Sequence, residues 1–113
     1  MSATATDQAA ERANRAERLA ALVGKRVLVG ITLKDAGGEI VEQFQVSGLI
    51  AAATLKDGID IEQDENAGTF NLPPDPGAFY AAPPAHYRLR ATGRVVVDPD
   101  LLSTWDFHQP PDG

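Results

Sequence analysis

The chain has 113 residues, a formal net charge of −6, no cysteine, and one Trp, two Tyr and four Phe. This length corresponds to a single domain that can bury a sizeable hydrophobic core. The absence of cysteine excludes disulfides, Cys-ligated metal centres and thiol nucleophiles, and the negative charge argues against nucleic acid, whose binding requires neutralisation of backbone phosphates.

Residues 7–22 predict the helix of this chain. The segment consists mainly of Ala, Glu, Arg, Gln and Leu, which are strong helix formers, and Gly24 is placed to end it. Its apolar stripe is mostly alanine and widens only in the last turn. We therefore expect Leu19, Leu22 and Val23 to anchor the helix to the rest of the protein.

From Lys25 the spacing of apolar residues changes from helical to alternating, which is typical of strands. Residues 27–33 and roughly 39–55 predict two strands, joined by a glycine-containing hairpin turn at 34–38. The alternation in the second strand is lost near Gly48. We expect a bend there, because glycine inside a strand often marks a bulge or a bend.

The rest of the chain predicts shorter strands separated by turns. Apolar pairs at 59–61 and 70–72 indicate two of them. A proline-rich excursion at 73–86 is expected to leave the sheet, because proline cannot donate to a strand ladder. Residues 87–97 predict a hairpin, and residues 103–107 predict a last short strand.

These elements together predict a mainly β protein that begins with one α-helix. The expected architecture is a small, strongly bent antiparallel sheet or an SH3-like barrel of five to seven strands. In this organisation a helix within residues 1–24 packs on a single β-barrel domain at 25–107, and residues 108–113 form a loose tail.

Two resemblances accompany this prediction. The succession of a helix and hairpin-linked strands over residues 7–72 looks like an SH3-like or Sm-like barrel, without the RNA-binding motif of the Sm family. Residues 72–105 carry LPPD, YRLR-x-TG and an NPD-like element in which Asp98 stands in place of Asn. That stretch resembles a group of small uncharacterised bacterial proteins. The resemblance implies a bacterial protein with one coherent fold, and it implies no activity.

Residues that serve catalysis in other proteins are present without the spacing that catalysis needs. The serines lack a G-x-S-x-G context, and the glycines mark turns instead of phosphate-binding loops. His86 and His108, with Asp106 close to His108 in the sequence, are a possible metal or catalytic group. The interpretation we favour is that both are ordinary surface histidines, and we predict no enzyme activity, no catalytic residue and no cofactor.

A run of acidic residues follows the second predicted strand. The run comprises Asp57, Asp60, Glu62, Asp64 and Glu65. It lacks the glycine and the final carboxylate that an EF-hand loop needs. We interpret it as a solvated strand face that protects an edge from aggregation, with a weak calcium or magnesium site as the alternative. We therefore predict no metal-ligating residue.

Basic residues gather on the predicted hairpin at 87–97. Arg88 and Arg90 share a strand face, and the turn brings Arg94 back beside them. Three converging guanidinium groups can hold a phosphate or a partner's carboxylates. The interpretation we favour is internal pairing of these arginines with Asp98, with Asp100 or with the strand face of Asp60, Glu62 and Asp64.

Most aromatic residues lie in the same part of the chain, after residue 78. Such residues line a groove for a peptide or an apolar ligand, or they cap an open end of the barrel. The residues that we assign to partner binding are Arg88, Arg90, Arg94, Phe79, Tyr80 and Trp105.

The sequence therefore favours a non-enzymatic cytoplasmic protein that binds another protein through this arginine and aromatic surface. One alternative is a protein that binds a small ligand or a divalent metal. Another is an acidic inhibitor or immunity-type protein directed against a basic target. No apolar stretch reaches the length of a membrane span. The alanine-rich helix predicts a monomer or a weak homo-oligomer.

Overall fold

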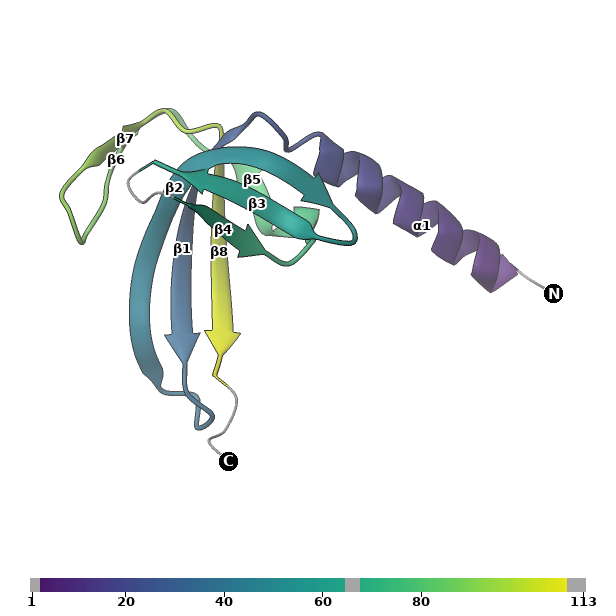
Figure 1. The fold of residues 1–113 in the computed structure, drawn as a ribbon, viewed down its shortest axis with the longest axis horizontal. Coiled ribbons are helices and arrows are strands. Elements are labelled where there is room, and N and C mark those ends of the chain that lie inside the picture. The colour runs from purple at the N-terminus through teal and green to yellow at the C-terminus, as the bar shows by residue number, and fades with distance from the viewer. Residues whose placement is uncertain (1–2, 65–67, 110–113) are drawn as a thin grey trace.

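The computed structural model describes residues 3–64 and 68–109. Its elements in chain order are α1 (Ala3–Ala20), β1 (Arg26–Lys34), β2 (Ile40–Thr54), β3 (Gly58–Gln63), β4 (Thr69–Leu72), the 3₁₀ helix η1 (Pro76–Ala78), β5 (Phe79–Ala81), β6 (His86–Arg88), β7 (Val95–Val97) and β8 (Leu101–His108). Figure 1 shows that α1 extends away from the strands. The prediction of a mainly β protein with one N-terminal helix is confirmed.

The strands form a six-stranded sheet in the order β4-β3-β2-β1-β8-β5 and a separate pair, β6 and β7. The sheet is bent and open, with β4 and β5 at opposite edges, so the strands that the structure describes do not close into a barrel (Figure 1). Of the two architectures that the sequence predicts, the bent sheet describes the fold and the closed barrel does not. One pairing also differs from the antiparallel expectation, because β8 runs parallel to β1.

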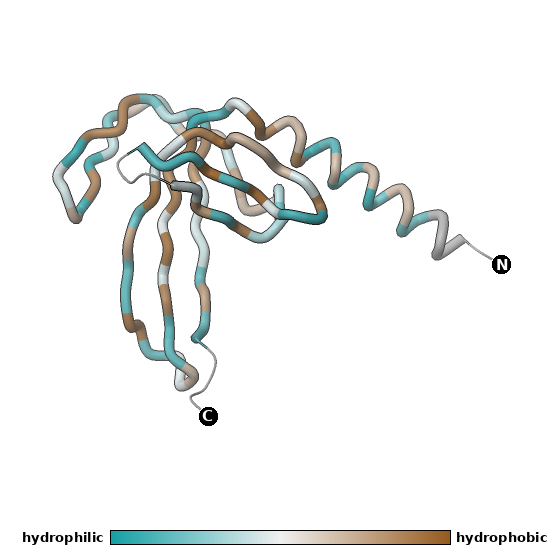
Figure 2. The backbone as a smooth tube through the Cα atoms, viewed as in Figure 1, coloured by the Kyte–Doolittle hydropathy of each residue, from teal (hydrophilic) through white to brown (hydrophobic). Residues whose placement is uncertain are grey.

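β1, β2 and β8 extend beyond the other strands (Figure 1). β3 pairs with β2 only from Gly48 onwards, and β5 pairs with β8 only as far as Ser103. The remaining lengths form a three-stranded ribbon that we call the finger: residues 29–34 of β1, 40–47 of β2 and 104–108 of β8. Hydrophobic and hydrophilic residues alternate along these strands, so the finger has two chemically different faces (Figure 2).

One face of the sheet carries the main core. Its buried residues are Leu19, Leu22, Val27, Val29, Ile31, Val46, Ile50, Ala53, Ile59, Ile61 and Leu72. β2 is strongly curved (Figure 1), and β3 and β4 lie over this face. The register of β2 with β3 shifts between Ile50 and Ala52, just after Gly48, near which an irregularity was predicted. On the opposite face Leu28 packs with Leu89 and Val96 of the β6–β7 hairpin. The hairpin therefore covers the upper part of the second face and leaves its lower part open.

Helix α1 begins before the predicted residue 7 and ends near the predicted position. Leu19 and Leu22 are buried as expected, whereas Val23 is 44% exposed, so the prediction that Val23 anchors the helix is wrong. The turn after the helix is the reason. Gly24 adopts a positive φ of 87°, and its N–H donates to the carbonyl of Ile50, which directs the chain into β1 and leaves Val23 outside.

The C-terminal third differs most from expectation. Within the proline-rich excursion, β5 joins the sheet, with Phe79 opposite Ser103. It lies at the sheet edge, where prolines next to a strand are tolerated because no ladder hydrogen bond is lost. β8 is longer than the predicted strand and lies inside the sheet. His108 belongs to it and not to a loose tail, and residues 110–113 lie outside the described residues.

Candidate functional site

Two of the three arginines predicted to converge are engaged within the protein. Arg88 Nη1 donates to the carbonyl of Gly93 at 3.2 Å, inside its own hairpin. Arg94 Nη2 lies 3.4 Å from Oδ2 of Asp64. Internal pairing, the interpretation that the sequence favoured, therefore occurs for Arg94, and its partner Asp64 belongs to the acidic run.

Asp64 connects three parts of the fold. Arg26 Nη1 donates to both carboxylate oxygens, at 2.8 and 2.9 Å, and Ser47 Oγ donates at 3.1 Å. The side chain of Asp64 is 17% exposed. Burial acts to raise its pKa, but the hydrogen bonds from Arg26 and Ser47 and the charges of Arg26 and Arg94 outweigh it, so the pKa of Asp64 lies below 3.8. This carboxylate holds the hairpin against β1 and β2.

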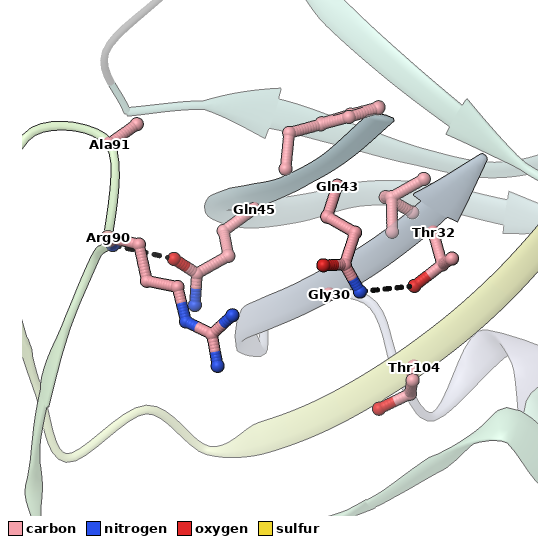
Figure 3. Close-up of a pocket in the computed structure, with 9 residues that line it drawn as sticks. Gly30, Thr32, Gln43, Gln45, Arg90, Ala91 and Thr104 are labelled. Atoms are coloured by element: carbon pink, nitrogen blue, oxygen red, sulfur yellow. Dashed lines mark hydrogen bonds between the residues drawn. The ribbon is translucent and has the colours of Figure 1, made fainter. Parts of the chain in front are cut away.

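The third arginine, Arg90, lies beside a cavity of about 360 Å³ on the second face of the finger. We call this cavity the Arg90 pocket. It is lined by Gly30, Ile31, Thr32, Gln43, Phe44, Gln45, Arg90, Ala91 and Thr104. Figure 3 shows that the Arg90 side chain extends from the hairpin into the pocket, beside the amide of Gln45.

Strand register brings the other lining residues together. Gly30 of β1 lies between Gln45 of β2 and Thr104 of β8, and Thr32 lies opposite Gln43. These residues share one face because side chains alternate along each strand. A Cβ atom at Gly30 would meet nothing within 4 Å, so this glycine leaves the floor of the pocket open.

Hydrogen bonds orient the two glutamines. The backbone N–H of Arg90 donates to Oε1 of Gln45 at 2.8 Å, and Nε2 of Gln43 donates to Oγ1 of Thr32 at 3.3 Å (Figure 3). Within residues 3–64 and 68–109, no hydrogen bond or ion pair engages the guanidinium of Arg90. The lining residues include no carboxylate. The pocket therefore presents a positive charge and several donors to a ligand that accepts hydrogen bonds.

The sequence identified Arg90 and missed the residues around it. A signal was present, because Gln43 and Gln45 have the same parity on a predicted strand, and Gly30 and Thr32 interrupt the apolar character of the preceding one. Shared parity places such residues on one face. Only the pairing of the strands shows that these faces adjoin.

The three predicted aromatic residues lie away from this pocket, and none of them lines it. Phe79 and Trp105 pack edge to face, with ring centroids 6.3 Å apart, and both contact the main core. Nε1 of Trp105 donates to Oγ of Ser103 at 2.7 Å. Tyr80 is 52% exposed. Phe79 and Trp105 therefore pack against the main core, whereas Tyr80 does not.

The acidic run does not form a metal site in the part that the structure describes. No three side chains of His, Cys, Asp and Glu lie close enough together there to hold a metal ion. Asp60 accepts a hydrogen bond from Asn71 Nδ2 at 2.8 Å, and Asp64 is engaged as described above. Glu65 lies outside the described residues.

His86 lies at the start of β6, whereas His108 lies at the end of β8. Asp106 is on β8 with His108.

None of the helices among the described residues has both the length and the apolarity that are needed to cross a membrane.

Comparison with known proteins adds no relative. No family model, no curated protein and no solved structure matches the chain. The Arg90 pocket and the surfaces around it are therefore the basis on which a function is proposed.

Proposed function

We propose that this protein is a non-enzymatic binding module that holds another protein through a carboxylate placed in the Arg90 pocket. The guanidinium in the pocket, which no described residue engages, is the observation that carries the proposal. A guanidinium binds a carboxylate through two parallel hydrogen bonds, and the nearby amide of Gln45 and hydroxyl of Thr104 offer further donors. An aspartate, a glutamate or a C-terminal carboxylate has this chemistry.

The exposure of the pocket favours a partner protein over a small metabolite. Gln43, Gln45, Arg90, Ala91 and Thr104 are all exposed. Sites for small molecules enclose most of the ligand surface, whereas an exposed pocket suits a side chain that protrudes from a larger surface. The lining residues include no imidazole, carboxylate or thiol to act as a general acid or base, so they supply no set for proton-transfer chemistry.

The charge of the whole molecule limits the partner further. With a net charge of −6, the protein repels a strongly acidic surface. The partner is therefore expected to present a single carboxylate on a surface that is otherwise neutral or basic. Added salt is expected to weaken the complex, because the pocket is exposed and its charge is screened.

Arg90→Gln is expected to remove the preference for a carboxylate. The probes are two short peptides that differ only in a central Glu or Gln. Wild type should bind the Glu peptide about tenfold more tightly, since a hydrogen bond to a charged group contributes about 1.5 to 3 kcal/mol. NMR titration of the side-chain signals of Arg90 and Gln45 measures both affinities. Arg88→Gln is the matched control, because Arg88 is on the same hairpin and bonds to Gly93. Equal binding of both peptides to wild type would refute the proposal.

Gly30→Val tests the same pocket by filling its floor. The residue lies in a strand, has open space where the added methyl groups would lie and has no positive φ, so valine fits the backbone. We expect binding of the Glu peptide to be lost while the melting temperature stays equal or rises. Calorimetry of the free variant checks the fold, and a variant that is stable and still binds would place the ligand elsewhere.

A further inference from the structure

The second feature of the finger is an edge of β8 that no described strand covers. β8 pairs with β1 along its whole length, up to His108 opposite Lys34. On its other side it pairs with β5 only at Leu101–Ser103. The outer side of residues 104–108, which we call the β8 edge, is therefore without a neighbouring strand among residues 3–64 and 68–109.

The backbone groups of this edge point outward in a regular row. The N–H of Gln109 donates to the carbonyl of Lys34 at 2.7 Å, so the backbone of Gln109 faces β1. Backbone directions alternate along a strand, and the register with β1 has no shift. Thr104, Asp106 and His108 therefore direct their N–H and C=O groups away from β1, as a template for another strand.

The opposite edge of the finger, which β2 forms, is protected against pairing with a further strand, whereas the β8 edge is not. The register of β2 with β1 shifts between Leu33 and Lys34, which leaves Val41 as an extra residue on β2. A bulge of this kind blocks pairing with a further strand. On this side the N–H of Asp64 also donates to the carbonyl of Ser47 at 2.9 Å. The β8 edge has no bulge, no proline and no lysine.

We propose that the β8 edge binds an extended segment of a partner protein as an additional strand. Along this edge, one side presents Trp105 and Phe107, whose rings stack with centroids 5.8 Å apart and are half-buried. The other side presents Asp106, whose side chain is 55% exposed. An added strand would place alternate side chains beside these two rows. The fitting segment alternates apolar residues with polar or basic ones.

Charge selects a basic partner segment. Four carboxylates lie on the finger and its turn, at Asp35, Glu39, Glu42 and Asp106, against the basic residue Lys34 and His108. Lys34 Nζ lies 3.7 Å from Asp106 Oδ2, an exposed pair that leaves most of the carboxylate accessible. A lysine or arginine opposite Asp106 is therefore favoured.

A second copy of the chain fits the edge less well. Each copy carries a net charge of −6, and antiparallel pairing centred on the edge places two Asp106 side chains opposite each other. Like charges in that position are destabilising. The proposal is independent of the Arg90 pocket, although Thr104 borders both surfaces.

Hydrogen exchange of the free protein provides the first test. Because the outward amides have no acceptor, those of Thr104, Asp106 and His108 should exchange at least about a hundredfold faster than those of Trp105 and Phe107. Sedimentation at the same concentration should show a monomer. Protected outward amides in a monomer would show that the edge is already covered, and protected amides in a dimer would make a second copy the occupant. Either result overturns the proposal.

Peptide binding provides the second test. The probes are an octapeptide of alternating valine and lysine, one of alternating valine and glutamate, and a valine–lysine analogue N-methylated at every residue. The first should bind wild type about tenfold more tightly than the second, since opposite charges favour strand pairing, and it should protect the three outward amides. The N-methylated analogue should not bind, because it can donate from neither edge.

Variants of Asp106 test whether the β8 edge is the site at which the peptides bind. Wild type should prefer the valine–lysine peptide over the valine–glutamate peptide. Asp106→Lys should reverse this preference, and Asp106→Asn, which changes the surface less, should abolish it. Asp57→Lys is the matched control, since it makes the same charge change on a distant turn. Arg90→Gln should leave binding of the valine–lysine peptide unchanged, which separates this result from the test of the pocket. An unaltered preference in both Asp106 variants would overturn the proposal.

Discussion

Gly48→Ala is expected to destabilise the protein by about 3 kcal/mol or more, at the upper end of the usual effect of overpacking. Gly48 lies at the start of the antiparallel pairing of β2 with β3, opposite Gln63. A Cβ atom there would overlap the carbonyl oxygen of Glu62 and lie 2.8 Å from the carbonyl carbon, and backbone atoms do not move aside as side chains do. β3 is held in place by Ile59 and Ile61, which are fully buried in the core. The added methyl group must therefore separate two paired strands.

Gly30→Ala is the matched control for this prediction. It makes the same change in the adjacent strand, where a Cβ atom meets nothing within 4 Å. Alanine should be neutral there or stabilising by up to about 1 kcal/mol, because glycine loses more backbone entropy on folding. Urea unfolding of both variants measures the difference. Equal stability of the two variants would contradict the close approach of the β2 and β3 backbones at Gly48.

Asp64→Asn is expected to lower the free energy of unfolding by about 2 kcal/mol at pH 7, because it removes the charge from hydrogen bonds with Arg26 and Ser47. The pKa of Asp64 is lower in the folded protein than its ordinary 3.8. Its stabilising contribution is therefore complete at pH values above 3.8 and is lost as the pH falls through the folded pKa. The difference between wild type and variant should be constant from pH 7 to about 5 and should shrink below 3.8.

Glu62→Gln serves as the control for the pH dependence. Glu62 is an exposed carboxyl on the neighbouring strand β3, with no hydrogen bond or ion pair to its side chain among the described residues. Its removal should change stability by less than about 0.5 kcal/mol at any pH in this range. Unfolding by urea at a series of pH values gives both curves. A gap between wild type and Asp64→Asn that persists undiminished to pH 2 would argue against the charge of Asp64 as the cause.

Local patterns predicted much of the secondary structure. The alternation of residues 27–33 and the turn after it correspond to β1 and the β1–β2 hairpin, and the long second strand was predicted within one residue at each end. The irregularity of β2 just after Gly48, between Ile50 and Ala52, was predicted too, because a loss of alternation beside glycine is visible in a few neighbouring residues. The prediction that Val23 anchors the helix was wrong because the position of Val23 depends on the hydrogen bond between Gly24 and Ile50, which is distant in sequence.

The candidate site was only partly predictable for a similar reason. The sequence placed three arginines on one hairpin, but it did not show which would remain unpaired. Asp64 engages Arg94, and Gly93 accepts from Arg88, so Arg90 is left facing the pocket. The choice among the three depends on where the hairpin docks on the sheet.

The sequence by itself determined the mainly β class, the leading helix, the bend in β2 and the segment that contains Arg90. These features follow from side-chain periodicity and turn residues, which act over a few neighbours along the chain. Only the tertiary structure decided that β8 runs parallel to β1, that the sheet stays open, and that Gly30, Gln45 and Thr104 meet beneath Arg90. The physical reason is that strand pairing joins residues that are far apart along the chain, and the same local pattern is compatible with several partners.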